Sequence, residues 1–132
     1  MTSETPAAVL VAARTILDRP EAVTSSAWAR STALLTRQAL EAALGDFWRS
    51  RAPGMEDCPL RAQLVALQFY VPDPAAARVA HQTWASLSHA CHHHAYDLAP
   101  TASELRGWLD TVAQLVDGLD AARPGAPVTP RA

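Results

Sequence analysis

The stretch "SSAWARSTALLTRQALEAALGDFWRSR", residues 25–51, predicts the longest helix of the chain. Its apolar residues recur at helical spacing, and they are Ala29, Ala33, Leu40, Ala43, Leu44 and Phe47. This spacing predicts a helix from Ser25 or Ser26 to Arg51 that several neighbours contact. Arg30, Arg37, Glu41 and Arg51 are expected mainly elsewhere on its surface.

Four further segments carry helix signals on either side of this central one. Thr5 and Pro6 mark the start of a helix over 6–18, and a third helix follows from Pro59 until "PDP" breaks it. Asp73 and Pro74 are a cap and first position for a helix over 74–96. "TASE", residues 101–104, is a capping box before a last apolar stripe that ends near Leu119. With no strand pattern, we expect an all-α fold, a compact four- to five-helix bundle.

The length of 132 residues suits one domain, which we place at residues 1–122. The remaining residues, 123–132, read "RPGAPVTPRA". Three prolines in these ten residues leave little to pack, so we expect a disordered Pro-rich tail.

The formal net charge of −2 argues against binding nucleic acid by bulk electrostatics. Cys58 and Cys91 form no disulfide scaffold pattern, which favours a reducing compartment. "MTSETPAAVL" has no secretory signal pattern, and no apolar run approaches a membrane span. The sequence therefore predicts a cytoplasmic protein without membrane contact.

The segment "SHACHHHAYD", residues 88–97, holds four of the five histidines. At about 100° per residue, one polar ridge forms along the predicted fourth helix. Its members are Arg78, His81, His89, His92 and Tyr96. The opposite side carries Ala80, Trp84, Leu87 and Cys91, which form a core face. His94 would face inward on a regular helix, and it would turn toward a cleft if the helix loosens before Tyr96.

Three interpretations of this ridge remain open. A metal site would use the i, i+4 pair His89 and His93, but further ligands must come from another helix, and there is no HExxH or paired CxxC. We therefore expect no metal and no cofactor. A metal-binding helical bundle ranks last among the three functions that we consider. Imidazole chemistry on RNA or nucleotides is the second interpretation. A structural polar face is the third, and it suits His81 and His93 best.

The ending "HAYDLAPTASELRGWLD", residues 94–110, and the helix "ARSTALLTRQALEAALGDFW", residues 29–48, resemble the HEPN superfamily (higher eukaryote and prokaryote nucleotide-binding domains). These small helical bundles carry an Arg, four to six residues, then a His, commonly extended as His-x-Tyr before a final helix. His94 and Tyr96 match that extension. The resemblance covers about residues 26–119, and the lysine-free, Ala-rich style suggests an actinobacterial-type branch.

The resemblance implies a dimer in which two motif copies meet, and many members are metal-independent endoribonucleases. In them a His acts at the ribose 2′-hydroxyl or the leaving oxygen, while the Arg stabilises phosphate charge. Carried onto this chain, the catalytic candidates are His89, His94 and Tyr96. The nucleotide- or RNA-binding candidates are Arg78, His92 and Arg106.

The motif Arg is expected at residues 87–89, which are Leu87, Ser88 and His89. His89 stands in the slot with four intervening residues, but an imidazole cannot make the bidentate guanidinium contact with phosphate. We therefore expect a HEPN-like, non-catalytic or weakly active module. It would act as a homodimer that associates with RNA, nucleotide or a protein such as a nucleotidyltransferase-like partner. The alternative is a metal-independent HEPN endoribonuclease of toxin or defence type.

Overall fold

The computed structural model describes residues 4–19, 27–92 and 98–123 of the chain. Its α-helices are α1 (Pro6–Leu17), α2 (Ala27–Arg51), α3 (Leu60–Leu67), α4 (Pro74–Cys91) and α5 (Ala102–Ala121), with a short 3-10 helix, η2 (Met55–Asp57). No strand occurs in these described ranges. The prediction of an all-α helical bundle is confirmed.

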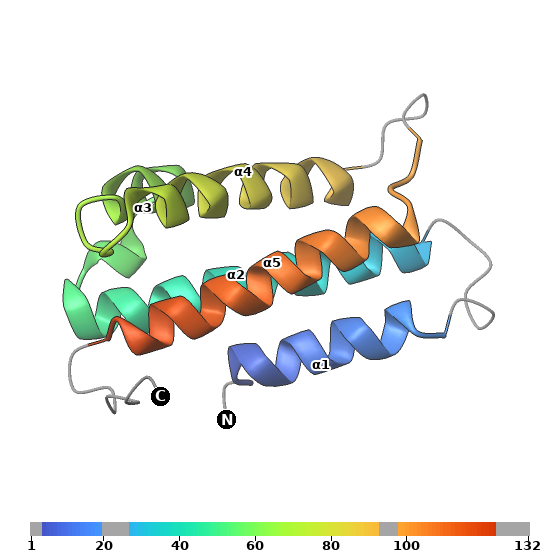
Figure 1. Ribbon diagram of the computed structural model, residues 1–132, viewed down its shortest axis with the longest axis horizontal. Helices are drawn as coiled ribbons and strands as arrows, with labels where there is room; N and C mark the ends of the chain where they lie inside the picture. Colours follow the sequence, from blue (N-terminus) through green and yellow to red (C-terminus); the bar gives the residue numbers. More distant parts are fainter. Residues whose placement is uncertain (1–3, 20–26, 93–97, 124–132) are drawn as a thin grey trace.

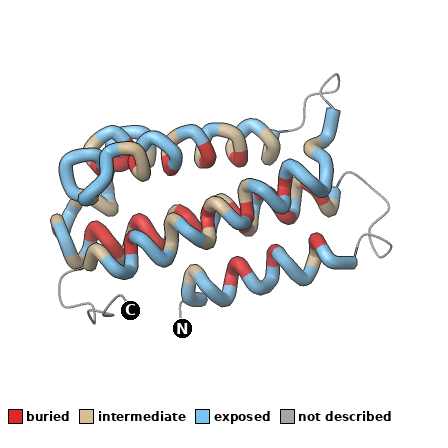
Figure 2. Tube along the Cα trace, viewed as in Figure 1, coloured by how far each residue is buried: buried red, intermediate tan, exposed pale blue. Residues whose placement is uncertain are grey.

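Helix α2 is the centre of the bundle, because α1, α4 and α5 all pack against it. In Figure 1, α3 and α4 lie on one side of α2 and α5, and α1 lies on the other. The buried positions face inward between the helices (Figure 2). Among the largest fully buried side chains of α2 are Leu40, Leu44, Phe47 and Trp48. The periodicity of residues 25–51 correctly predicted this central role.

Side-chain caps fix where three of the helices begin. Thr5 Oγ1 accepts a hydrogen bond from the Ala8 backbone N–H at 3.2 Å, and Asp73 Oδ1 accepts one from Ala75 at 2.9 Å. At α5, Thr101 and Glu104 form the predicted capping box, with both reciprocal hydrogen bonds at 3.1 Å. Each cap satisfies an N–H group that has no partner within its own helix.

The turn between α2 and α3 contains η2, which the sequence patterns did not predict. Gly54 has a φ of 103°, a conformation that favours glycine, and its N–H donates to Glu56 Oε2 at 2.9 Å. The buried Gln63 side chain donates from Nε2 to the Cys58 carbonyl oxygen at 2.7 Å. These contacts hold a turn that has no periodic apolar pattern of its own.

Helix α4 ends at Cys91, whereas we expected it to continue to Tyr96, so that boundary is wrong. His92 is the C-cap residue, with φ −89° and ψ 126°, and its N–H donates to the His89 carbonyl oxygen. Histidine has a weaker helix propensity than the alanines of the preceding turns, and three histidines follow Cys91 in succession. His94 and Tyr96 lie outside the described residues, as do residues 124–132 of the predicted tail.

Two further expectations concern disulfide bonds and membrane contact. Cys58 and Cys91 are both free thiols. In the described part of the chain, no helix combines the length and the apolarity needed to span a bilayer.

Candidate functional site

A pocket of about 400 Å³ lies between the start of α2 and the end of α4. These two helix ends are found at the same end of the bundle (Figure 1). The lining residues are Ala27, Arg30, Ser31, Leu34, Arg37, Cys91 and His92. The pocket is open to solvent and combines two guanidinium groups with small apolar side chains.

Arg30 and Arg37 supply the positive charge of this pocket. They stand seven residues apart on α2, about two helical turns, so they lie on the same face of the helix. Both side chains are half-buried. Neither Nε atom is exposed, and neither has a hydrogen-bond partner among the described residues. A buried N–H donor without a hydrogen-bond partner is costly, so these two Nε–H groups favour an acceptor such as an anionic oxygen in the pocket.

The carboxylate of Glu41 forms an ion pair with Arg37. The Arg37 Nε lies 3.4 Å from Glu41 Oε1, one turn further along α2, which is an ion pair without hydrogen-bond geometry. The same Glu41 oxygen accepts a hydrogen bond from Trp84 Nε1 of α4 at 3.2 Å. The carboxylate therefore links α2 to α4 and orients the Arg37 side chain at the pocket wall.

Cys91 contributes a thiol to the pocket. Burial raises the pKa of this thiol, Arg37 acts to lower it, and Glu41 acts to raise it. The net effect is a pKa above the ordinary value for cysteine. Because the thiolate is the nucleophilic form, Cys91 is poorly suited to nucleophilic catalysis at neutral pH.

His92 is exposed at the pocket, directly beyond the last turn of α4. It is the C-cap residue, so it departs from the helical ridge that the sequence predicted and turns with the chain. His92 therefore places an imidazole ring beside the two arginines.

The other described residues of the predicted ridge do not line the pocket. Arg78 and His89 are exposed on α4, and His81 is half-buried there. Arg78 stands thirteen residues before Cys91, roughly 20 Å along the helix axis. His94 and Tyr96 lie outside the described residues. The described ridge residues on α4 therefore lie outside the pocket, whereas His92, beyond the end of the helix, lines it.

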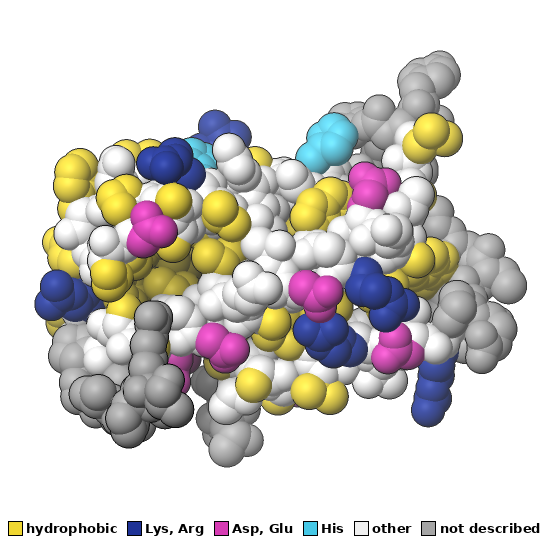
Figure 3. Space-filling view, viewed as in Figure 1, with side chains coloured by type: hydrophobic (Ala, Val, Ile, Leu, Met, Phe, Trp, Pro, Cys, Tyr) yellow, Lys and Arg dark blue, Asp and Glu magenta, His cyan; other side chains and the backbone are white. Residues whose placement is uncertain are grey.

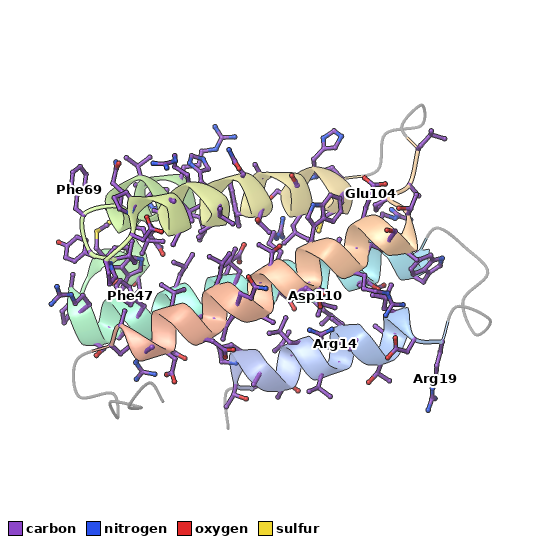
Figure 4. The ribbon with its side chains drawn as sticks, in the orientation of Figure 1. Arg14, Arg19, Phe47, Phe69, Glu104 and Asp110 are labelled. Carbon is purple, nitrogen blue, oxygen red and sulfur yellow. The ribbon has the colours of Figure 1, made fainter. Side chains whose placement is uncertain are left out.

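Arg106 lies on α5 and takes part in a surface ion pair. Its Nη1 donates to Asp18 Oδ1 at 3.3 Å, which joins the start of α5 to the end of α1. A parallel contact, Arg14 Nη1 to Asp110 Oδ1 at 3.0 Å, joins the same two helices (Figure 4). Arg106 thus occupies a bundle seam and does not line the pocket.

The sequence patterns missed the two pocket arginines, because Arg30 and Arg37 were expected elsewhere on the surface of α2. Their i, i+7 spacing was a usable signal, since residues two turns apart share a face. What the spacing could not provide was the partner element, because only the packed fold shows that α4 ends opposite this face.

The chemistry of the pocket suits binding an oxyanion. Guanidinium groups offer several N–H donors in a fixed fork, which matches phosphate and carboxylate geometry. Within the described residues, no group of three or more His, Cys, Asp and Glu side chains is arranged to hold a metal ion. The chain thus presents a cationic, partly apolar pocket with a protonated thiol.

Comparisons with protein families, curated proteins and solved structures found no match to the chain. The resemblance to the HEPN superfamily stays a prediction.

Proposed function

We propose that the protein is a HEPN-like helical domain that acts as a non-catalytic or weakly active, RNA- or nucleotide-associated module. In this proposal the domain works as a homodimer in the cytoplasm, and the pocket between α2 and α4 binds a phosphate group. The observation that carries the proposal is the pair of half-buried arginines, Arg30 and Arg37, beside Cys91 and His92.

Arg30 and Arg37 can supply the positive charge that the missing arginine of the Arg-to-His motif would provide. No Arg stands at residues 87–89, where the resemblance expects one. Arg30 and Arg37 instead approach the end of α4 from the neighbouring helix α2. Charge-assisted hydrogen bonds from guanidinium to phosphate are strong, and bidentate contacts add geometric selectivity. This supports phosphate binding without the motif arginine.

The protonation of Cys91 supports a binding role over a catalytic one. Catalysis at neutral pH needs a group whose pKa suits proton transfer or nucleophilic attack. The raised pKa of Cys91 moves this thiol away from that range. The described pocket wall otherwise offers guanidinium groups, a serine hydroxyl and one exposed imidazole, His92.

Ligand binding by arginine variants tests the proposal. Fluorescence polarisation with labelled RNA oligonucleotides and labelled nucleotides should show binding that weakens about tenfold or more in Arg30→Gln and in Arg37→Gln. Arg49→Gln is the matched control, because Arg49 lies on the same helix but is exposed and paired with Asp46 at 2.6 Å. Equal binding by all three variants would contradict phosphate binding in the pocket between α2 and α4.

A cleavage assay distinguishes the endoribonuclease alternative from the non-catalytic proposal. Purified protein is incubated with total RNA in EDTA, and the non-catalytic proposal expects little or no cleavage. Cleavage that is lost in both His89→Ala and His94→Ala would favour the metal-independent ribonuclease instead.

The dimer is tested by light scattering of the intact chain, and a monomer at all concentrations would contradict that part of the proposal.

A further inference from the structure

We infer that the pocket between α2 and α4 selects a phosphate monoester, such as the terminal phosphate of a single nucleotide, over the internal phosphodiesters of an RNA strand. This inference rests on the proposed function and deepens it. It concerns which phosphate chemistry the two arginines recognise. A free nucleoside monophosphate and a 5′-phosphorylated RNA end share that chemistry.

The pocket carries more positive than negative charge, because only one of its two arginines is paired with a described carboxylate. Arg30 forms no ion pair with a described carboxylate, in contrast to Arg14, Arg49, Arg106 and Arg123, which are all paired. Glu41 approaches Arg37 at Nε, which leaves the terminal amino groups of that guanidinium without a described hydrogen-bond partner. A phosphate monoester carries close to two negative charges near neutral pH and an internal phosphodiester carries one, so a net positive pocket attracts the monoester more strongly.

The size of the pocket matches a small ligand. A volume of about 400 Å³ falls at the lower end of the range for small-molecule sites, roughly 300–1,000 Å³. Ala27 and Leu34 form apolar wall beside the arginines, and Leu34 is 39% exposed. These side chains can cover the ring or base of a nucleotide whose phosphate contacts the guanidinium groups.

The face of the molecule shown in Figure 3 has no continuous basic groove of the kind that holds a nucleic acid strand. Strand binding without sequence preference uses a continuous basic groove with aromatic stacking platforms. On the face shown in Figure 3, basic and acidic side chains are interspersed over α1, α4 and α5. The chain also carries a net charge of −2. A small cationic pocket in a chain of this net charge favours one terminal phosphate over a run of phosphodiesters.

The contact of Glu41 with Trp84 explains how Arg37 keeps its place at the pocket wall. A long arginine side chain loses much rotamer freedom when it is fixed for binding. The Glu41 carboxylate, held by the Trp84 indole N–H, fixes Arg37 through its Nε atom before any ligand arrives. Glu41 and Trp84 are therefore positioning residues for phosphate binding.

The experiment compares four probes against the full chain by isothermal titration calorimetry. The probes are adenosine 5′-monophosphate, adenosine, and one short RNA oligonucleotide prepared with a 5′-phosphate and with a 5′-hydroxyl. Adenosine monophosphate and the 5′-phosphorylated RNA should each bind about tenfold or more tightly than their unphosphorylated partners. That preference should disappear in Arg30→Gln and Arg37→Gln, and it should survive in Arg49→Gln.

A second readout reports on the pocket itself. In a Cys58→Ser background, Cys91 is the remaining cysteine, and its rate of alkylation by iodoacetamide can be followed by mass spectrometry. Adenosine monophosphate should slow this reaction, because the bound ligand covers the thiol and its charge further disfavours the thiolate. Adenosine at the same concentration should not slow it.

The possible failures are distinguishable. Equal binding of the 5′-hydroxyl and 5′-phosphorylated RNA, still dependent on Arg30 and Arg37, would overturn the monoester inference and leave the proposed function standing. Binding of adenosine monophosphate without protection of Cys91 would place the ligand elsewhere and overturn the inference. If no probe binds a variant-sensitive site, both the inference and the proposed function are contradicted.

Discussion

Cys91 is the residue whose chemistry depends most directly on its neighbours. Burial raises the pKa of its thiol, Arg37 opposes that rise, and Glu41 adds to it. Removing the charge of Arg37 and removing that of Glu41 should therefore change the reactivity of the Cys91 thiol in opposite directions. A change in the solvent exposure of the thiol alone would not produce opposite effects.

In a Cys58→Ser background, Arg37→Gln should raise the pKa of Cys91 further and slow its alkylation at mildly alkaline pH. Glu41→Gln should lower that pKa and accelerate the reaction. Rates measured by mass spectrometry across a pH series check both signs. If both variants accelerate the reaction, they act by opening the pocket, and the electrostatic account of Cys91 is contradicted.

The same raised pKa has a consequence for stability at alkaline pH. The thiol ionises at lower pH in the unfolded chain than in the folded one, so the folded state holds the proton more tightly. The contribution of Cys91 is therefore fully present below the unfolded pKa and is lost as pH rises through the folded pKa. Urea unfolding of Cys91→Ser should show a weaker fall of stability over this alkaline window than the parent chain.

Trp84 combines a structural contact with a positioning role. Trp84→Phe should cost about 1–2 kcal/mol of unfolding free energy, because it removes the hydrogen bond to the Glu41 carboxylate at 3.2 Å. Trp108→Phe is the matched control, since that half-buried indole N–H has no described hydrogen-bond partner. Urea denaturation measures both, and an equal loss in the two variants would show that the Trp84 hydrogen bond contributes nothing specific.

At the scale of single elements, the capped starts of three helices were predictable, whereas α3 ends at Leu67 before the predicted break at "PDP" and α4 ends at Cys91 before the predicted Tyr96. Thr5, Asp73 and Thr101 announce their helices because a cap and its acceptor atom are local features. The end of α4 depends on how far its last turn remains packed, and a histidine-rich segment gives no stop signal of the Gly or Pro kind. This is why the predicted ridge extended beyond Cys91.

The capping box of α5 provides the test at this scale. Thr101→Ala should destabilise the protein by about 1 kcal/mol, because it leaves the Glu104 backbone N–H without its acceptor. Ser103→Ala is the control, since Ser103 is exposed in the first turn of the same helix and forms no described side-chain hydrogen bond. Thermal or urea unfolding that fails to separate the two variants would contradict the capping role.

At the scale of the whole molecule, the apolar pattern predicts the core and charge alone does not predict the pocket. The stripes of α2 and α5 supply buried side chains such as Leu40, Leu44 and Leu109, as their spacing indicated. The pocket arises where the start of α2 meets the end of α4, which are about sixty residues apart in the sequence. Such long-range proximity depends on packing, so the roles of Arg30 and Arg37 could not be read from either helix alone.

The same substitution at a buried and an exposed leucine tests the core. Leu109→Ala should cost about 2–5 kcal/mol, because Leu109 is fully buried on α5 where it faces the other helices. Leu98→Ala should change stability by less than about 0.5 kcal/mol, because this side chain is 96% exposed. Comparable losses in the two variants, measured by urea denaturation, would contradict the packing described for the bundle.

The central claim is that Arg30 and Arg37 together bind a phosphate group, and NMR of arginine side chains tests it most directly. The ¹H–¹⁵N signals of the arginine Nε–H groups are assigned with Arg30→Gln, Arg37→Gln and Arg49→Gln, and adenosine 5′-monophosphate is then titrated into the full chain. The account predicts that the Arg30 and Arg37 signals shift together and saturate, while the Arg49 signal stays in place. Signals of Arg30 and Arg37 that do not move, or that move no more than that of Arg49, would contradict it.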